Sequence, residues 1–379
     1  MVVEQILLNK FRHFHYSHFT FNPKTNLLVG RNGSGKTSIL EALYYLAYAK
    51  SFRSRSAHTL ISHDASCLQI DAKIQTPQHA HFIQSAYGSN KSDCSLKMDH
   101  DAGVKQSEIA KLLPVVFIDT STHREFSQTP KNRRDYVNWC CFYTASAYHT
   151  DLAKYQRVLQ QRNQLLKQQK LSGQNMSSQI ASWTEPLIHY GQRVHEARLD
   201  IIASLNAQLM KHWSYFFSFD SASIEYHPGW NTAHSYSDCL QQALAQDIQY
   251  GYTQNGPHRA DIHCMTHQNE LIFQTFSQGQ QKLFSYLLRF IQLDLVAKEN
   301  RSHRLLLIDD LPAELDVDNQ GKILDYLQNI DCQKFITALS SEVFDKKFTE
   351  QAIYVDAPKP NQNCIEPVDY RALTIQESS

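Results

Sequence analysis

The first 120 residues alternate between apolar and polar positions in short segments, a pattern that predicts β-strands. Residues 3–11 and 19–21 fit two strands joined by a polar turn, and residues 26–29 form a short apolar run. Three alternating segments follow between residues 67 and 98, and the apolar run 115–118 suits a buried strand. This part of the chain therefore predicts a structure built largely on strands.

Helical spacing of apolar residues appears in two places. One helix is expected to begin near Lys36, directly after the strand at 26–29. A longer helical region begins after about residue 121, where residues 130–170 and 178–213 carry the same spacing. The sequence pattern typical of strands resumes near Tyr252. The order of these patterns predicts an α/β fold interrupted by an inserted helical lobe.

The expected domain boundaries lie where the pattern changes between strand-like and helix-like. We expect residues 1–120 and 252–379 to form one α/β head with an antiparallel β subdomain, and residues 121–251 to form the helical lobe. The chain has 379 residues with 42% hydrophobic content, which favours two lobes over one. Lys and Arg together number 37, as do Asp and Glu, so any binding to nucleic acid must rest on local basic patches.

The cysteines and the N-terminal segment bear on the compartment. The eight cysteines are scattered without a CxxC pair, so no zinc site or redox pair is predicted. No apolar run approaches the ~20 residues of a membrane span. The first residues resemble a strand rather than a signal peptide. Free thiols without a secretory signal indicate a reducing cytoplasm.

A phosphate-binding loop follows the strand at 26–29 and opens the expected helix, in the pattern GxxxxGK[ST]. Its glycines allow backbone N–H groups to converge on phosphate oxygens, and the helix N-terminus adds positive potential. Lys36 would reach the β- and γ-phosphates of ATP, and Thr37 would ligate Mg²⁺. The candidate nucleotide-binding residues are Gly30, Arg31, Asn32, Gly33, Ser34, Gly35, Lys36 and Thr37.

Two acids end a second apolar strand, residues 305–308. Asp309 is placed to orient Mg²⁺, and Asp310 is placed to polarise the attacking water, which makes it a catalytic candidate together with Lys36. Alone, this pattern also fits a strand that runs into an acidic surface turn. Its occurrence beside a phosphate loop favours the catalytic interpretation.

Residues 276–282, FSQGQQK, resemble the LSGGQ signature of ABC ATPases. This resemblance implies an ABC-type P-loop ATPase head, in which Ser277, Gly279 and Gln280 contact the γ-phosphate held by a second copy of the chain. Ser277 would then act in catalysis, and ATP would drive head-to-tail dimerisation. The alternative is a plain Ser N-cap on a helix. Residues 313–316 resemble the D-loop of that family.

The segment departs from the ABC pattern at two positions. One of the two glycines of LSGGQ is not matched, because the middle of the segment reads Gln278-Gly279, and Ala338 stands where the switch histidine is expected. Two other classes remain open at this point. One is the ATPase subunit of a transporter, which the long separation of the phosphate loop from residue 277 disfavours. The other is a small-molecule P-loop kinase, for which the signature would be accidental.

Several further segments resemble the RecF family of bacterial DNA replication and repair proteins, over nearly the whole chain. They occur in the family's order and spacing, with substitutions at His13, Thr184 and Ala260. The segments are LNKFRHF (8–14), SFR (51–53), PKNRRDYV (130–137), LQQRN (159–163), GPHRAD (256–261) and LLLIDDLPAELD (305–316). The resemblance implies an ATP-closed dimer that binds duplex DNA near gaps and acts with RecR and RecO to help load RecA.

The DNA contacts that this function requires would come from local basic clusters. No helix-turn-helix, zinc finger or stacking platform is evident, so sequence-specific base reading is not expected. Internal pairing of Arg133 and Arg134 with acids is the alternative for these two residues. The candidate DNA-binding residues are Arg53, Arg55, Lys131, Arg133 and Arg134.

Overall fold

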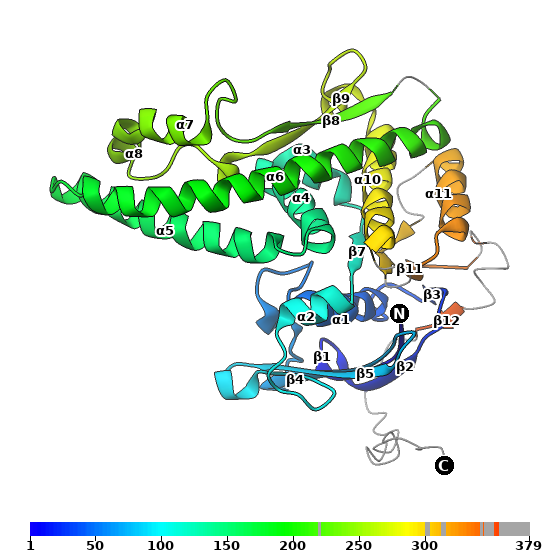
Figure 1. Ribbon diagram of the computed structural model, residues 1–379. Helices are drawn as coiled ribbons and strands as arrows, with labels where there is room; N and C mark the ends of the chain where they lie inside the picture. Colours follow the sequence, from blue (N-terminus) through cyan, green and yellow to red (C-terminus); the bar gives the residue numbers. More distant parts are fainter. Residues whose placement is uncertain (219–220, 300–303, 312–315, 342–343, 345–351, 356–379) are drawn as a thin grey trace. The chain divides into compact units, whose positions relative to one another are not determined.

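The computed structural model describes residues 1–218, 221–299, 304–311, 316–341, 344 and 352–355. Two compact units are present. Unit 1 contains Met1–Val115, Leu307–Asp310 and the chain from Cys332 onward, and unit 2 contains Val116–Leu306 and Leu311–Asp331. Figure 1 labels the elements of both units, and each unit is described by itself below.

The first sheet of unit 1 is antiparallel, as expected from the alternating segments. Its strand order is β2-β1-β4-β5-β6. Strand β2 begins earlier than the expected Phe19, because residues 14–20 pair continuously with β1. The strands are β1 (Val2–Phe11), β2 (Phe14–Thr20), β4 (Cys67–Gln75), β5 (Ala80–Gly88) and β6 (Ser95–Met98).

The second sheet carries the phosphate loop. Its order is β12-β3-β11-β10-β7, and β3 pairs in parallel with both β11 and β12. Every residue of β10 and β11 is buried, which is typical of a parallel sheet. The β10 residues are all apolar, whereas β11 also buries Gln333, Lys334 and Thr337. The strands are β3 (Thr25–Val29), β7 (Val115–Ile118), β10 (Leu305–Ile308), β11 (Gln333–Ala338) and β12 (Ala352–Tyr354). Helices α1 (Lys36–Tyr48) and α2 (Gln106–Leu112) also belong to unit 1.

Unit 2 is built on a long helical hairpin, in which α5 and α6 lie side by side (Figure 1). Helix α5 (Tyr148–Ser172) ends at Gly173, whose φ of 69° is the left-handed conformation that glycine adopts readily. Helix α6 (Ser177–Phe216) contains Pro186 and buries an apolar face that α10 (Gln278–Glu299) contacts.

The remaining elements of unit 2 surround this hairpin. A two-stranded antiparallel sheet is formed by β8 and β9. The helices and strands are α3 (Thr122–Gln128), α4 (Pro130–Thr144), β8 (Ala222–His227), α7 (Tyr236–Gln242), α8 (Leu244–Tyr250), β9 (Asp261–Thr266), α9 (Ile272–Thr275) and α11 (Val317–Asn329). Short 3₁₀ turns occur at residues 57–60, 91–93 and 257–259.

The compact units differ from the expected head and lobe at several boundaries. Residues 116–120, 252–306 and 311–331 were expected in the head, but they belong to unit 2. The physical reason is pairing and packing within that unit, because β9 forms its sheet with β8 and α10 packs against α6. The strand-like pattern that begins again near Tyr252 therefore belongs to unit 2 and not to unit 1.

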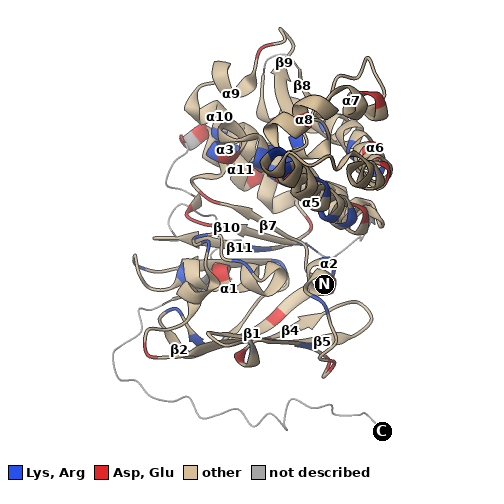
Figure 2. Cartoon of the chain, turned by 90° about the vertical axis from the view of Figure 1, so that its left-hand side faces the viewer, with Lys and Arg blue, Asp and Glu red and all other residues tan. Residues whose placement is uncertain are grey.

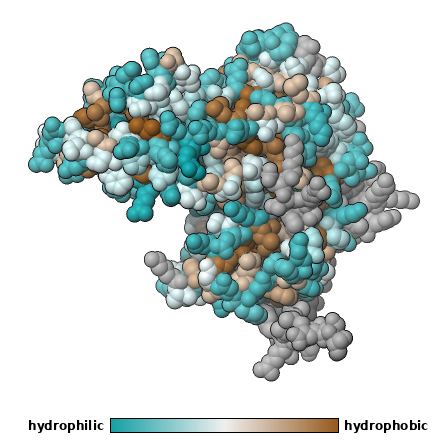
Figure 3. All heavy atoms as spheres, viewed as in Figure 1, coloured by the Kyte–Doolittle hydropathy of each residue, from teal (hydrophilic) through white to brown (hydrophobic). Residues whose placement is uncertain are grey.

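Within the described residues, no helix is both long and apolar enough to cross a bilayer. Figure 3 shows polar residues interspersed with separate apolar spots over one face of the helical hairpin. Most large apolar side chains of the unit 2 helices are buried, whereas Leu171, Leu199 and Met210 are exposed.

Candidate nucleotide site

The phosphate loop occupies the turn between β3 and α1, as predicted. Gly35 precedes α1 with a φ of 108°, a conformation that strains any side chain. A Cβ added to Gly35 would also lie 2.4 Å from His13 Nε2. Lys36 Nζ donates to the carbonyl oxygens of Gly30 (2.7 Å) and Arg31 (3.0 Å), which holds the loop closed.

The two acids at the end of β10 meet this loop. Asp309 Oδ1 accepts hydrogen bonds from Thr37 Oγ1 (3.0 Å) and from Thr337 Oγ1 (2.7 Å). The Thr337 hydroxyl in turn accepts a hydrogen bond from the Asp310 backbone N–H at 2.8 Å. Asp310 has a φ of 59°, a left-handed conformation that Asp tolerates better than most residues. The sequence motifs therefore converge as expected.

A cavity of about 240 Å³ lies above these residues, and all of its lining belongs to unit 1. Burial lowers the pKa of Lys36 within it, and the carboxylates of Asp310 and Asp309 oppose this shift. The cavity combines cationic, hydroxyl and carboxylate groups, the set that a phosphate with a divalent cation requires. It is lined by His13, Asn32, Gly33, Gly35, Lys36, Thr37, Ser38, Arg53, Asp309, Asp310 and Thr337.

The residues present fit ATP with Mg²⁺. Ser34 Oγ is buried without a hydrogen-bond partner, so it is available to a ligand in the loop. Thr37 Oγ1 and Asp309 Oδ1 are 3.0 Å apart, close to the separation of about 3 Å between adjacent oxygen ligands of octahedral Mg²⁺. Within the described residues, no cluster of three His, Cys, Asp or Glu side chains suits a metal. A metal here would therefore depend on Thr37, Asp309 and phosphate oxygens.

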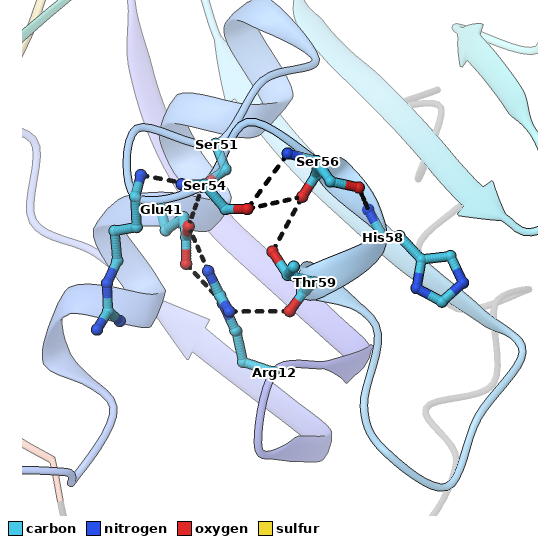
Figure 4. A network of polar contacts seen from close by, with 8 residues as sticks. Arg12, Glu41, Ser51, Ser54, Ser56, His58 and Thr59 are labelled. Atoms are coloured by element: carbon cyan, nitrogen blue, oxygen red, sulfur yellow. Dashed lines mark hydrogen bonds and ion pairs between the residues drawn. The ribbon is translucent and has the colours of Figure 1, made fainter.

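Sequence reasoning missed a polar network behind the phosphate loop (Figure 4). Glu41, a fully buried residue of α1, accepts two hydrogen bonds from the Arg12 guanidinium at 2.8 and 2.7 Å. Glu41 also accepts a hydrogen bond from Ser51, and Arg12 donates to the carbonyl of Thr59 at 2.8 Å. The network fixes the segment 51–59 against α1. The sequence does contain one signal of this network: Glu41 is a charged residue among the apolar residues of the helix that follows the phosphate loop.

This segment positions Arg53, which was expected to contact DNA. Its backbone N–H donates to Ser51 Oγ at 3.0 Å, and its side chain lines the nucleotide cavity beside Lys36. Arg55 lies outside that cavity and lines a neighbouring hollow formed by residues 49–57. Arg53 thus lines the candidate nucleotide cavity, and its contact with DNA stays a prediction.

His13 is a second residue that sequence reasoning did not place in the site. Its Nε2 atom is buried without a partner, next to Gly35. Burial lowers the pKa of His13, the Ser34 backbone raises it, and Arg12 lowers it further. The environment therefore favours the uncharged form of the His13 ring, directly beside the phosphate loop.

The signature segment forms the N-terminus of α10 in unit 2. Ser277 Oγ accepts from the Gln280 N–H at 3.3 Å, and Gln280 Oε1 accepts from the Ser277 N–H at 2.9 Å. This reciprocal pair is a capping box, so the plain N-cap interpretation holds locally. Ser277 is nevertheless exposed, and a Cβ on Gly279 would meet only Asp316, at 3.8 Å. Ser277 and Gly279 are therefore accessible at the surface of unit 2.

The expected D-loop and the expected switch-histidine position both follow the signature segment in the chain. Of the proposed D-loop, residues 313–315 lie outside the described residues, and Asp316 accepts the Asn319 N–H as the N-cap of α11. At the expected switch position, Ala338 is buried and carries no polar group. The neighbouring Thr337 lines the cavity instead.

Arg133 and Arg134 have internal partners. Arg133 pairs with Asp261 through two hydrogen bonds of 2.8 Å, and it donates to the carbonyl of Phe126 at 2.8 Å. Arg134 donates to the carbonyl of Ala260 at 2.8 Å. The structure thus favours the internal alternative for both arginines. Lys131 is exposed and pairs with Asp135 on the same helix at 3.0 Å.

The remaining family-like segments meet in the interior of unit 2. The Arg162 and Asp247 side chains are fully buried and form an ion pair of 2.8 Å. Arg162 also donates to Thr253 at 2.6 Å, and Tyr155 bonds His258 at 2.6 Å. These segments therefore hold α5 to α8 and to the turn at 257–259, rather than lining the nucleotide cavity.

Comparison with known proteins identifies related sequences. The family described as RecF/RecN/SMC N terminal domain matches residues 2–361. A protein named DNA replication and repair protein RecF, from Hydrogenovibrio crunogenus, is 33% identical over 92% of this chain and 95% of its own length. A protein of the same name from Shigella dysenteriae is 30% identical over 90% of this chain and 94% of its own length.

Solved structures resemble the fold. A structure described as the recombination mediator protein RecF-ATPrS in the RecFOR pathway has a TM-score of 0.82 at 24% identity, over 90% of this chain and 94% of that chain. An SMC head bound to the C-winged helix domain of ScpA has a TM-score of 0.56 at 14% identity, over 94% of each chain. At these identities the resemblance establishes the fold.

Proposed function

The chain belongs to the RecF family of DNA replication and repair proteins, and from this premise we propose that it is an ATP-driven dimerisation switch that binds duplex DNA near gaps. The observation that carries the proposal is the convergence of Lys36, Thr37, Asp309 and Asp310 on one cavity. Its partners would be double-stranded DNA, RecR and RecO, and its task would be to help load RecA. The neighbour described as part of the RecFOR pathway supports these partners.

The residues of the cavity have separate roles in ATP hydrolysis. Thr37 and Asp309 would hold Mg²⁺, which supplies charge neutralisation at the phosphate oxygens when bound. Lys36 would exchange its bonds to the Gly30 and Arg31 carbonyls for phosphate oxygens. The backbone N–H groups of the loop and the Ser34 hydroxyl would complete the cradle.

Asp310 would accept the proton of the attacking water. ABC ATPases generally place Glu at this position, and Asp is one methylene shorter. The carboxylate therefore reaches less far from a backbone that the Thr337 hydroxyl already holds in place. A general base contributes roughly 10²–10⁴-fold to a rate, so imperfect placement is expected to make hydrolysis slow. A slow ATPase suits a switch, because the closed state then persists.

Ser277 would complete the site of a second copy of the chain. Its hydroxyl and the N-terminus of α10 are exposed, and a helix N-terminus attracts anions. ATP gripped from both sides would stabilise only the closed dimer. Hydrolysis would remove the γ-phosphate contact and release that stabilisation. Gly279 and Gln280 would support Ser277 in this contact.

The compartment and the competing function follow from the same observations. The seven cysteines in the described part of the chain are free thiols, which suits the cytoplasm. An ATPase subunit of an ABC transporter is not favoured, because the related sequences are RecF proteins along about nine-tenths of the chain.

The direct test is duplex-DNA affinity measured with ATP, with ADP and without nucleotide. We expect ATP to tighten binding at least 10-fold relative to the other two conditions. Lys36→Met should abolish the difference while leaving the fold intact, as judged by circular dichroism. Equal affinity in all three conditions would exclude an ATP-driven DNA switch.

A further inference from the structure

The junction of α5 and α8 in unit 2 brings two tyrosines beside two lysines. Helix α8 ends at Gly251, whose φ of 83° is left-handed. A Cβ on Gly251 would lie 3.3 Å from Lys170 Cδ and 3.6 Å from Lys167 Cα, so the turn lies directly against α5. Lys170 Nζ also donates to the Tyr250 carbonyl at 3.3 Å. The flanking residues Tyr250 and Tyr252 are thereby placed next to both lysines.

Both tyrosine rings are open to solvent. Tyr250 is 51% exposed and Tyr252 is 40% exposed, and their ring centroids are 6.0 Å apart. The guanidinium of Arg259, which is also exposed, lies 5.3 Å from the centre of the Tyr252 ring. We call Lys167, Lys170, Tyr250, Tyr252 and Arg259 the α5–α8 patch. It combines two exposed aromatic rings with three cations.

The charge of this region is unbalanced, in contrast to the neutral chain. No Asp or Glu occurs between Asp151 and Glu185, whereas five Lys or Arg do. Figure 2 shows Lys and Arg positions, in blue, along α5. The acid on α8, Asp247, is fully buried against Arg162 and does not neutralise the surface. The exposed cations of the patch therefore attract anions.

We propose that the α5–α8 patch binds the unpaired strand of gapped DNA, next to the duplex that the proposed function requires. The cations would contact phosphates, and bases would stack on the exposed tyrosine faces. A duplex backbone alone would use only the cations, because its bases are already stacked. An acidic protein segment would likewise leave the rings unused. The inference rests on the proposed function, since it assigns the surface for one part of the same DNA.

The test compares a duplex that carries a single-stranded tail with a blunt duplex of equal paired length, both with ATP. The double variant Tyr250→Ala/Tyr252→Ala should lose at least 10-fold in affinity for the tailed duplex, as expected from the loss of base–aromatic stacking, and little for the blunt one. The matched control is Tyr16→Ala, an exposed tyrosine of β2 in unit 1. The double variant Tyr250→Phe/Tyr252→Phe retains both rings, so its affinity for the tailed duplex should equal that of the wild type.

The charge contribution is tested separately. Lys167→Gln/Lys170→Gln should lower the slope of log affinity against log salt for the tailed duplex by about 1.4, from roughly 0.7 per phosphate contact. Lys24→Gln/Lys97→Gln, two exposed lysines of unit 1, is the control and should leave the slope unchanged.

The outcomes separate this inference from the proposed function. Wild-type protein that binds neither DNA with ATP would overturn both. Normal ATP-dependent binding by the wild type, with unchanged tail affinity in the Ala double variant, would overturn only the α5–α8 patch. Equal losses in the Phe and Ala variants would also overturn it, because stacking requires only the ring. Selective loss in the Ala variant with recovery in the Phe variant supports it.

Discussion

Asp309 accepts a hydrogen bond from Thr37 at 3.0 Å, although the two residues are 272 positions apart in the chain. The contact joins the end of β10 to the start of α1 and places two oxygen atoms about as far apart as neighbouring ligands of Mg²⁺ would be. It is the point at which two separate sequence motifs become one site.

The first prediction concerns this pair. Asp309→Asn keeps a hydrogen-bond acceptor for Thr37 but removes the charge that attracts the metal. ATP affinity in Mg²⁺ should fall at least 10-fold, whereas affinity in EDTA should stay within about 2-fold of wild type. A fluorescent ATP analogue titrated in both conditions measures the difference. An equal loss with and without Mg²⁺ would show that Asp309 acts on the loop rather than on a metal.

The second prediction separates binding from hydrolysis at Asp310. Asp310→Asn should lower the steady-state ATPase rate about 100-fold or more, with ATP affinity within about 3-fold of wild type. Asp310→Glu should raise the rate, because the longer side chain reaches further toward the attacking water. Hydrolysis is followed as phosphate release in the presence of duplex DNA. A normal rate in Asp310→Asn would assign the general base to another residue.

The third prediction tests the buried ion pair of unit 2. Arg162→Met leaves the Asp247 carboxylate buried without its partner, so it should lower the free energy of unfolding by about 3–5 kcal/mol. The double variant Arg162→Met/Asp247→Leu should be more stable than the single one, because no lone charge remains. Urea denaturation followed by tryptophan fluorescence gives both values. A double variant no more stable than the single one would contradict this account.

The fourth prediction is a pH dependence of stability through His258. The pKa of His258 is lowered from 6.5 to about 4, chiefly by burial; the Thr253 backbone opposes this shift, and the nearby Arg259, Arg134 and Arg162 each add to it. The folded state therefore holds fewer protons than the unfolded state between these two values. The associated stability is present above pH 6.5 and is lost as the pH falls toward 4, by roughly 3 kcal/mol.

The control for this dependence is His258→Gln, which keeps hydrogen-bonding capacity but does not titrate. Its free energy of unfolding should change less than that of wild type between pH 7 and pH 4.5. Urea midpoints measured at half-unit pH intervals provide the comparison. Identical slopes in the two proteins would assign the pH dependence to other groups.

Local motifs were predictable because their chemistry lies within a few residues. The phosphate loop, the paired acids and the Ser277 cap each depend on neighbours in the sequence. The Arg12–Glu41 and Arg133–Asp261 pairs join residues 29 and 128 positions apart, so no local pattern reveals them. For the same reason Arg133 resembled a surface cation in the sequence, and the pairing of β8 with β9 moved residues 252–306 into unit 2.

The central claim is that two copies of the chain share each ATP through Ser277. The most direct measurement is molar mass by analytical ultracentrifugation with a non-hydrolysable ATP analogue, for wild type, Ser277→Arg and the nearby exposed control Gln274→Arg. Wild type and the control should shift from monomer to dimer, and Ser277→Arg should bind the analogue yet remain monomeric. A Ser277→Arg protein that dimerises as wild type does, or a wild type that binds the analogue and remains monomeric, would contradict the claim.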